Sequence, residues 1–92
     1  MRKRKLKILG HEYKVTYDDN LAVEEGSLGQ IEFTYNTIRI STKHTQSAQD
    51  EALLHEIVEA LNHHLEWKLE HSQITQISEC IYQVLETNKM LK

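Results

Sequence analysis

The stretch LLHEIVEALNHH, residues 53–64, contains residue types that could hold a metal ion and activate water. In a helix of 3.6 residues per turn, His55 and Glu59 lie one turn apart on the same face. Imidazole nitrogens and carboxylate oxygens are both zinc ligands, so this spacing allows the two side chains to share one ion. Glu56 follows His55 directly, in a position from which a carboxylate can reach a water at the metal without binding the metal itself.

The same spacing also fits a helix that binds nothing, because His and Glu at i and i+4 are common on a solvated helix face. Two observations favour a site. Four of the six histidines fall within residues 55–71. His71 also precedes a second predicted helix, where a short connection can fold it back over the first. A ligand set of His55, Glu59 and His63 is less favourable, because positions i and i+8 are about 12 Å apart along the axis. We expect His63 and His64 to be surface residues or hydrogen-bond donors to ligands.

Residues 55–85, HEIVEALNHHLEWKLEHSQITQISECIYQVL, resemble a family of small proteins encoded by phages and prophages. In that family a helix of the form H-E-[IV]-x-E-A-[LI]-N precedes a second helix ending near Y-Q-V-L. Its layout is similar to minimal zincins such as the SprT-like and ImmA/IrrE-like metallopeptidase domains. The resemblance implies that His55, Glu59 and His71 bind zinc or another divalent metal, with Glu56 as the general base.

The chain departs from the zincin pattern H-E-x-x-H at Glu59, which stands where the second histidine would be. Zinc accepts a carboxylate oxygen, but the added negative charge makes the metal a weaker Lewis acid. The function that the resemblance implies is nevertheless a zinc-dependent peptidase or hydrolase acting on a peptide or protein. One alternative is a non-catalytic phage accessory protein that binds another protein and keeps a structural or vestigial metal site. Another is an interaction module without metal.

The elements that must position these residues follow an α+β order, with strands first and helices second. Residues 5–17 and 30–41 alternate apolar and polar side chains, with Gly10 at a turn or bulge and Asn36-Thr37 at a second turn. Residues 18–29 are expected to form a loop or a very short helix. This pattern predicts a small antiparallel sheet of three or so strands, with TIRIS as an exposed strand that could pair with an extended peptide.

The second half has no glycine, and its apolar residues recur at spacings of three and four. We expect Ser47, with Asp50, to cap the first helix and Ser72 to cap the second. Cys80 is expected in the core, Trp67 and the tyrosines between sheet and helices, and Tyr82 within hydrogen-bonding distance of the site. The whole chain reads as one domain, a strand half (1–45) and a two-helix half (46–92).

Composition excludes several other classes. Net charge is −3, so no global basic field favours nucleic acid, although five of the first seven residues are basic and form a solvated terminus or a phosphate-binding arm. A single cysteine excludes an internal disulfide and a thiolate zinc site, and fits a reducing, cytoplasmic location. No apolar run is long enough to span a membrane, and no signal peptide is expected. The two-helix face is compatible with a homodimer.

Overall fold

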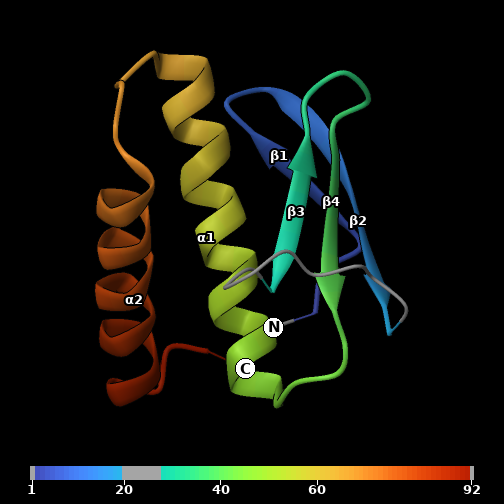
Figure 1. Ribbon diagram of the computed structural model, residues 1–92. Coiled ribbons are helices and arrows are strands. Elements are labelled where there is room, and N and C mark those ends of the chain that lie inside the picture. Colours follow the sequence, from blue (N-terminus) through green and yellow to red (C-terminus); the bar gives the residue numbers. More distant parts are fainter. Residues whose placement is uncertain (1, 20–27, 92) are drawn as a thin grey trace.

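The computed structural model describes residues 2–19 and 28–91, and it confirms the α+β class. A four-stranded sheet precedes two helices (Figure 1). In chain order the elements are β1 (Lys5–Ile8), β2 (His11–Asp18), β3 (Gly29–Glu32), β4 (Thr37–Ser41), α1 (Gln46–Leu65) and α2 (His71–Thr87). Of the expected loop or short helix at 18–29, residues 20–27 lie outside the described residues, while Gly29 already begins β3.

The sheet is mixed and not purely antiparallel, with strand order β1-β2-β4-β3. Two hairpins pair antiparallel, β1 with β2 and β3 with β4, but β2 and β4 run parallel. The predicted antiparallel sheet is wrong for that central pair. Apolar alternation specifies which face of a strand is buried and does not specify the neighbouring strand. TIRIS is therefore β4, an inner strand, and not an exposed edge.

Glycine and asparagine occupy the turns as their backbone conformations require. Leu9 and Gly10, between β1 and β2, both have positive φ, and Gly10 takes the larger value of 82°. This pair forms the two-residue connection of a tight hairpin, for which positive φ at both positions is favourable. Asn36 before β4 also has positive φ, 50°, as Asn tolerates better than most residues.

Helix α1 lies between the sheet and α2, so the molecule has three layers (Figure 1). The core forms where α1 packs on one face of the sheet, and its most buried side chains are Tyr13, Val15, Ile38, Ile40 and Leu53. Among the described elements α2 contacts only α1. Since α1 is covered on two sides, its burial extends to Ala60 and even to Glu56.

Both helix starts differ from the prediction. Thr45 caps α1, with its Oγ1 accepting a hydrogen bond from the Ala48 amide at 3.2 Å, and Ser47 already lies within the helix. Glu70 caps α2 in a capping box with Gln73, so Ser72 is likewise inside the helix. Threonine and serine are both good caps, so spacing alone cannot choose between neighbouring candidates.

Several side chains expected in the core or between sheet and helices are on the surface. Trp67, in the connection between the helices, is 50% exposed. Cys80 is exposed because α2 packs on one side only and fully buries just Ile74 and Ser78. Of the tyrosines, Tyr13 is fully buried but Tyr35 is 75% exposed. No helix in the described part of the chain is both long and apolar enough to cross a membrane.

Candidate metal centre

Helix α1 carries two of the predicted ligands on the side facing α2. The Nε2 atom of His55 and the Oε2 atom of Glu59 are 3.5 Å apart, as the one-turn spacing predicts. The side chains are 16% and 28% exposed, so both are partly accessible to solvent and neither is in the core. The same Glu59 oxygen is 3.8 Å from Nδ1 of His71, which is the first residue of α2.

The connection between the helices, residues 66–70, places His71 beside the other two. Glu66 and Lys68 have positive φ, which turns the chain sharply after α1. Asn62 holds the turn: its carbonyl accepts hydrogen bonds from the amides of Glu66 and Trp67, and its side-chain Oδ1 accepts one from the Leu69 amide at 2.9 Å. The role of Asn62 in this turn was not predicted from the sequence. The one indication of it is that an asparagine stands in the last turn of a predicted helix.

The three side chains fit a divalent metal. One ligand atom from each of His55, Glu59 and His71 can be chosen so that all lie within 4.8 Å of one another. Zinc–ligand bonds of 2.0–2.2 Å in tetrahedral geometry put neighbouring ligand atoms about 3.4 Å apart. The observed 3.5 and 3.8 Å are close to that spacing. These three residues form the one such group found in the described part of the chain, and they are the ligand set predicted from the sequence.

Local electrostatics also suit metal binding at His55. Its pKa is lowered, chiefly because burial disfavours the charged imidazolium, although the Glu59 carboxylate acts in the opposite direction. The neutral ring is the form that binds a metal, so no proton has to be displaced from His55 near neutral pH. His71 is 72% exposed, which leaves the group accessible from solvent.

Glu56 is buried beside this group, with only 5% of its surface exposed. Burial, and to a smaller extent the nearby Glu59 charge, raise the pKa of its carboxyl to about 8. The backbone of β3 lies against it, because a Cβ atom built on Gly29 would be 3.2 Å from the Glu56 Oε2. Glycine at position 29 is what allows this strand and this carboxylate to approach so closely.

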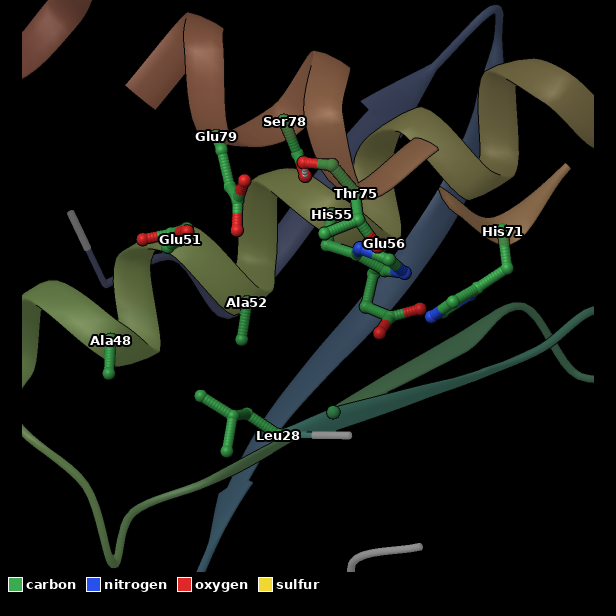
Figure 2. Close-up of a pocket in the computed structure, with 11 residues that line it drawn as sticks. Leu28, Ala48, Glu51, Ala52, His55, Glu56, His71, Thr75, Ser78 and Glu79 are labelled. Atoms are coloured by element: carbon green, nitrogen blue, oxygen red, sulfur yellow. Dashed lines mark hydrogen bonds between the residues drawn. The ribbon is translucent and has the colours of Figure 1, made fainter. Parts of the chain in front are cut away.

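A cleft of about 200 Å³ opens in front of the group (Figure 2). It runs between α1, α2 and the start of β3, and His55, Glu56 and His71 all line it. The other lining residues are Leu28, Gly29, Ala48, Glu51, Ala52, Thr75, Ser78 and Glu79. Tyr82, expected near the site, instead points its hydroxyl toward Glu86 at 3.5 Å.

The other histidines of α1 are occupied elsewhere. His63 stacks on Phe33, with ring centroids 3.8 Å apart. His64 stacks on His11 at 4.1 Å, and its Nε2 lies 2.6 Å from the Tyr13 hydroxyl. We call His11, Tyr13, Phe33, His63 and His64 the aromatic cluster. Nothing in the sequence pattern indicates that His11, at the β1–β2 turn, meets the end of α1.

Comparison with known proteins finds no matching family model and no significant match among curated proteins or solved structures. What the site does must therefore be argued from its geometry.

Proposed function

We propose that this protein binds one zinc ion through His55, Glu59 and His71 and hydrolyses peptide bonds in the adjoining cleft. The observation that carries the proposal is the convergence of two imidazoles and a carboxylate beside a second, buried carboxylate that is not part of the ligand group. Three protein ligands leave one position of a tetrahedral zinc for water or substrate, as in catalytic zinc sites.

In this proposal Glu56 acts as the general base. Bound zinc would supply Lewis acidity, polarising the carbonyl of the substrate and lowering the pKa of water. Glu56 accepts a proton from water as the water oxygen attacks the carbonyl carbon, and later gives it to the leaving amine nitrogen as the C–N bond breaks. With a pKa of about 8 the metal-free carboxyl is mostly protonated at neutral pH. A dication at the ligand group would favour its ionised form, so metal loading prepares the base.

The cleft supports a peptide as substrate. One wall is the start of β3 at Leu28 and Gly29, and the other is the groove between α1 and α2. An extended chain would lie along this groove, with its scissile carbonyl near His55 and Glu56. Glu59 weakens the Lewis acidity of the metal, so we expect slower turnover than a two-histidine H-E-x-x-H helix would give.

Metal analysis and one variant test the proposal. Untagged wild-type protein is purified, its zinc, iron, nickel and manganese content is measured, and cleavage of a mixed peptide pool is followed by mass spectrometry. We expect about one equivalent of zinc. Glu56→Gln should keep the zinc but lose about 10²- to 10⁴-fold in cleavage rate. Glu86→Gln, on the exposed part of α2, is the matched control and should leave both readings unchanged.

Other outcomes overturn parts of the proposal. Less than a tenth of an equivalent of any metal, with no uptake on titration, would contradict metal binding altogether. Stoichiometric metal with no cleavage by wild type would contradict the hydrolase and leave a metal that fastens α2 to α1 in a protein-binding accessory protein. Equal cleavage by wild type and Glu56→Gln would show that Glu56 is not the base.

A further inference from the structure

Helix α2 forms the outer layer of the molecule and packs on α1 with one side only (Figure 1). That side is marked by Ile74 and Ser78, the two residues that the helix buries fully. Five other residues recur at spacings of four and three, so they lie within about 80° of one another around the helix. These residues, which we call the α2 seam, are Gln73, Ile77, Cys80, Val84 and Thr87. Ile77 is half-buried and the other four are exposed, so the seam is a surface.

The α2 seam carries no charged residue. Charged residues make up 27% of the chain, but the 17 residues of α2, all of which the structure describes, include only Glu79 and Glu86. Glu79 lines the cleft. Glu86 lies two turns further along the same side, with its Oε2 atom 3.5 Å from the Tyr82 hydroxyl. Depletion of charge distinguishes the centre of a protein interface from the rest of a protein surface.

Apolar side chains accompany this lack of charge. Ile81 borders the seam and is 41% exposed, and Val84 within it is 49% exposed. Met90, which follows the helix, is 62% exposed. Three exposed large hydrophobic residues within ten positions form a patch, and covering it would contribute about 25 cal/mol for each Å² of apolar surface removed from water. No described element of the same chain covers it.

We propose that two copies of this chain associate through the α2 seam, with their α2 helices antiparallel. In a twofold interface the same surface meets itself, so a charge near the axis would face a like charge. The seam has none, and its glutamine amides both donate and accept hydrogen bonds, so they can pair with their own kind. A partner recognised through charge would find no complementary group on this side of α2.

The spacing of the seam also fits a second copy of the same helix. Side chains at alternating intervals of four and three interlock between two packed helices. Cys80 is the midpoint of the seam. An antiparallel alignment centred there places Ile77 against Val84 of the second copy and Gln73 against Thr87, so apolar residues meet apolar residues. It also sets the N-terminal end of each helix dipole beside the C-terminal end of the other.

The size of the seam determines how strong the association should be. A helix of 17 residues is about 25 Å long, so a contact along one side of it stays below the roughly 800 Å² per partner of a standard interface. We therefore expect a reversible dimer with a Kd on the order of 10–100 μM. His71 and Glu79 lie on the side of α2 that lines the cleft, so dimerisation leaves the cleft open.

Sedimentation velocity of the untagged, reduced full-length protein from about 5 to about 500 μM tests the proposal. Val84→Glu should raise the Kd at least about tenfold, because it places a charge in the apolar centre of the contact. Circular dichroism and zinc content should stay as in wild type. The matched control is Tyr35→Glu, which adds the same charge at an apolar residue that is 75% exposed and lies outside α2. This control should dimerise like wild type.

A short bis-maleimide crosslinker gives a second readout, since Cys80 is the one cysteine of the chain and is exposed. Wild type should form a covalent dimer, and Val84→Glu should form much less of it. In a Cys80→Ser background, a mixture of Gln73→Cys and Thr87→Cys proteins should crosslink with each other, while Gln73→Cys alone should not. Crosslinking of Gln73→Cys alone would overturn the antiparallel alignment.

The sedimentation results decide whether the seam is an interface at all. A monomer at every concentration would overturn the proposal. A dimer that Val84→Glu leaves intact would overturn the α2 seam as its surface, and a dimer lost equally in Tyr35→Glu would show that added charge, and not the position on α2, disrupts it.

Discussion

Helix α1 carries two groups of histidines that differ in almost every property that matters for metal binding. At its middle, His55 faces α2 and shares the Glu59 carboxylate with His71, at 3.5 and 3.8 Å. At its C-terminal end, His63 and His64 face the sheet and stack on Phe33 and His11. The first group offers nitrogen and oxygen atoms that point to a common centre. The second offers ring faces.

The difference shows that a carboxylate and a convergent geometry, and not the number of histidines, make a candidate metal site. In the aromatic cluster a close polar contact is already made, since His64 Nε2 lies 2.6 Å from the Tyr13 hydroxyl. The His11 and His64 rings are nearly parallel, with 2° between their planes and centroids 4.1 Å apart, so they present their faces to each other. Such a cluster fixes the β1–β2 turn onto α1 and contributes to stability.

The largest expected contrast between the two groups is in zinc affinity. His55→Ala or His71→Ala should each weaken zinc binding by more than about a hundredfold, because each removes a direct ligand. His63→Ala should change the affinity less than about threefold, since its ring lies on Phe33. Competition with a chromophoric chelator measures all three. A loss of zinc affinity in His63→Ala comparable to that in His55→Ala would contradict the distinction between the two groups of histidines.

Glu56, buried beside the metal ligands, and His64, in the aromatic cluster, should respond to pH with opposite sign. Glu56 has a pKa of about 8 in the folded protein and an ordinary value of 4.5, so between these values the folded state holds a proton that the unfolded state has lost. Metal-free stability should then fall as pH rises from 4.5 to 8, by up to about 1.4 kcal/mol per pH unit from this residue. Urea unfolding in EDTA checks this, and Glu56→Gln should remove that component.

His64 supplies the opposite response. Its pKa is lowered by desolvation and by the neighbouring His11 and His63, so the unfolded state binds a proton first as pH falls. The stability it contributes is present above its ordinary value of 6.5 and is lost as pH falls through its lowered pKa. The His64→Gln protein should lose less stability than wild type between pH 7 and pH 5. A larger loss would contradict this sign.

A smaller effect concerns how tightly the sheet approaches the middle of α1. At Gly29 an added Cβ would lie 3.1 Å from the Arg39 carbonyl oxygen and 3.2 Å from Glu56 Oε2. Gly29→Ala should cost about 1–3 kcal/mol in the free energy of unfolding, because the backbone contact cannot yield cheaply. Gly10→Ala is the control, since nothing lies within 4 Å of its Cβ and only its positive φ makes it costly.

The smallest expected effect is at the aromatic cluster. Tyr13→Phe removes the hydroxyl that lies 2.6 Å from His64 and should reduce the free energy of unfolding by about 1 kcal/mol. Zinc affinity should be the same as in wild type. Thermal unfolding with and without zinc measures both quantities. A change in zinc affinity would mean that the two ends of α1 are coupled through the helix.

Sequence reasoning predicted what depends on local spacing. The α+β order, the buried faces of the strands at Tyr13 and Val15 and at Ile38 and Ile40, and the closeness of His55 to Glu59 follow from periods of two and 3.6. The position of His71 near the other two could be predicted because its connection to α1 is short.

What could not be predicted depends on which elements meet. Parallel pairing of β2 with β4 leaves no trace in the alternation of either strand. Glu56 is buried because α1 is covered on two sides, and Cys80 is exposed because α2 is covered on one. The stack of His11 on His64 joins residues far apart in the chain and requires the tertiary structure to be known.

The packing of α2 determines which part of the molecule opens most readily. Among the described elements this helix touches only α1, and it fully buries just two of its residues. It is thus the layer with the lowest cost of local opening, and amide hydrogens there should exchange before those of the sheet. Because His71 travels with α2, an ion that needs all three ligands binds only the docked form and adds RT ln(1 + [M]/Kd) to its stability. Metal supply would then set how long the third layer stays closed.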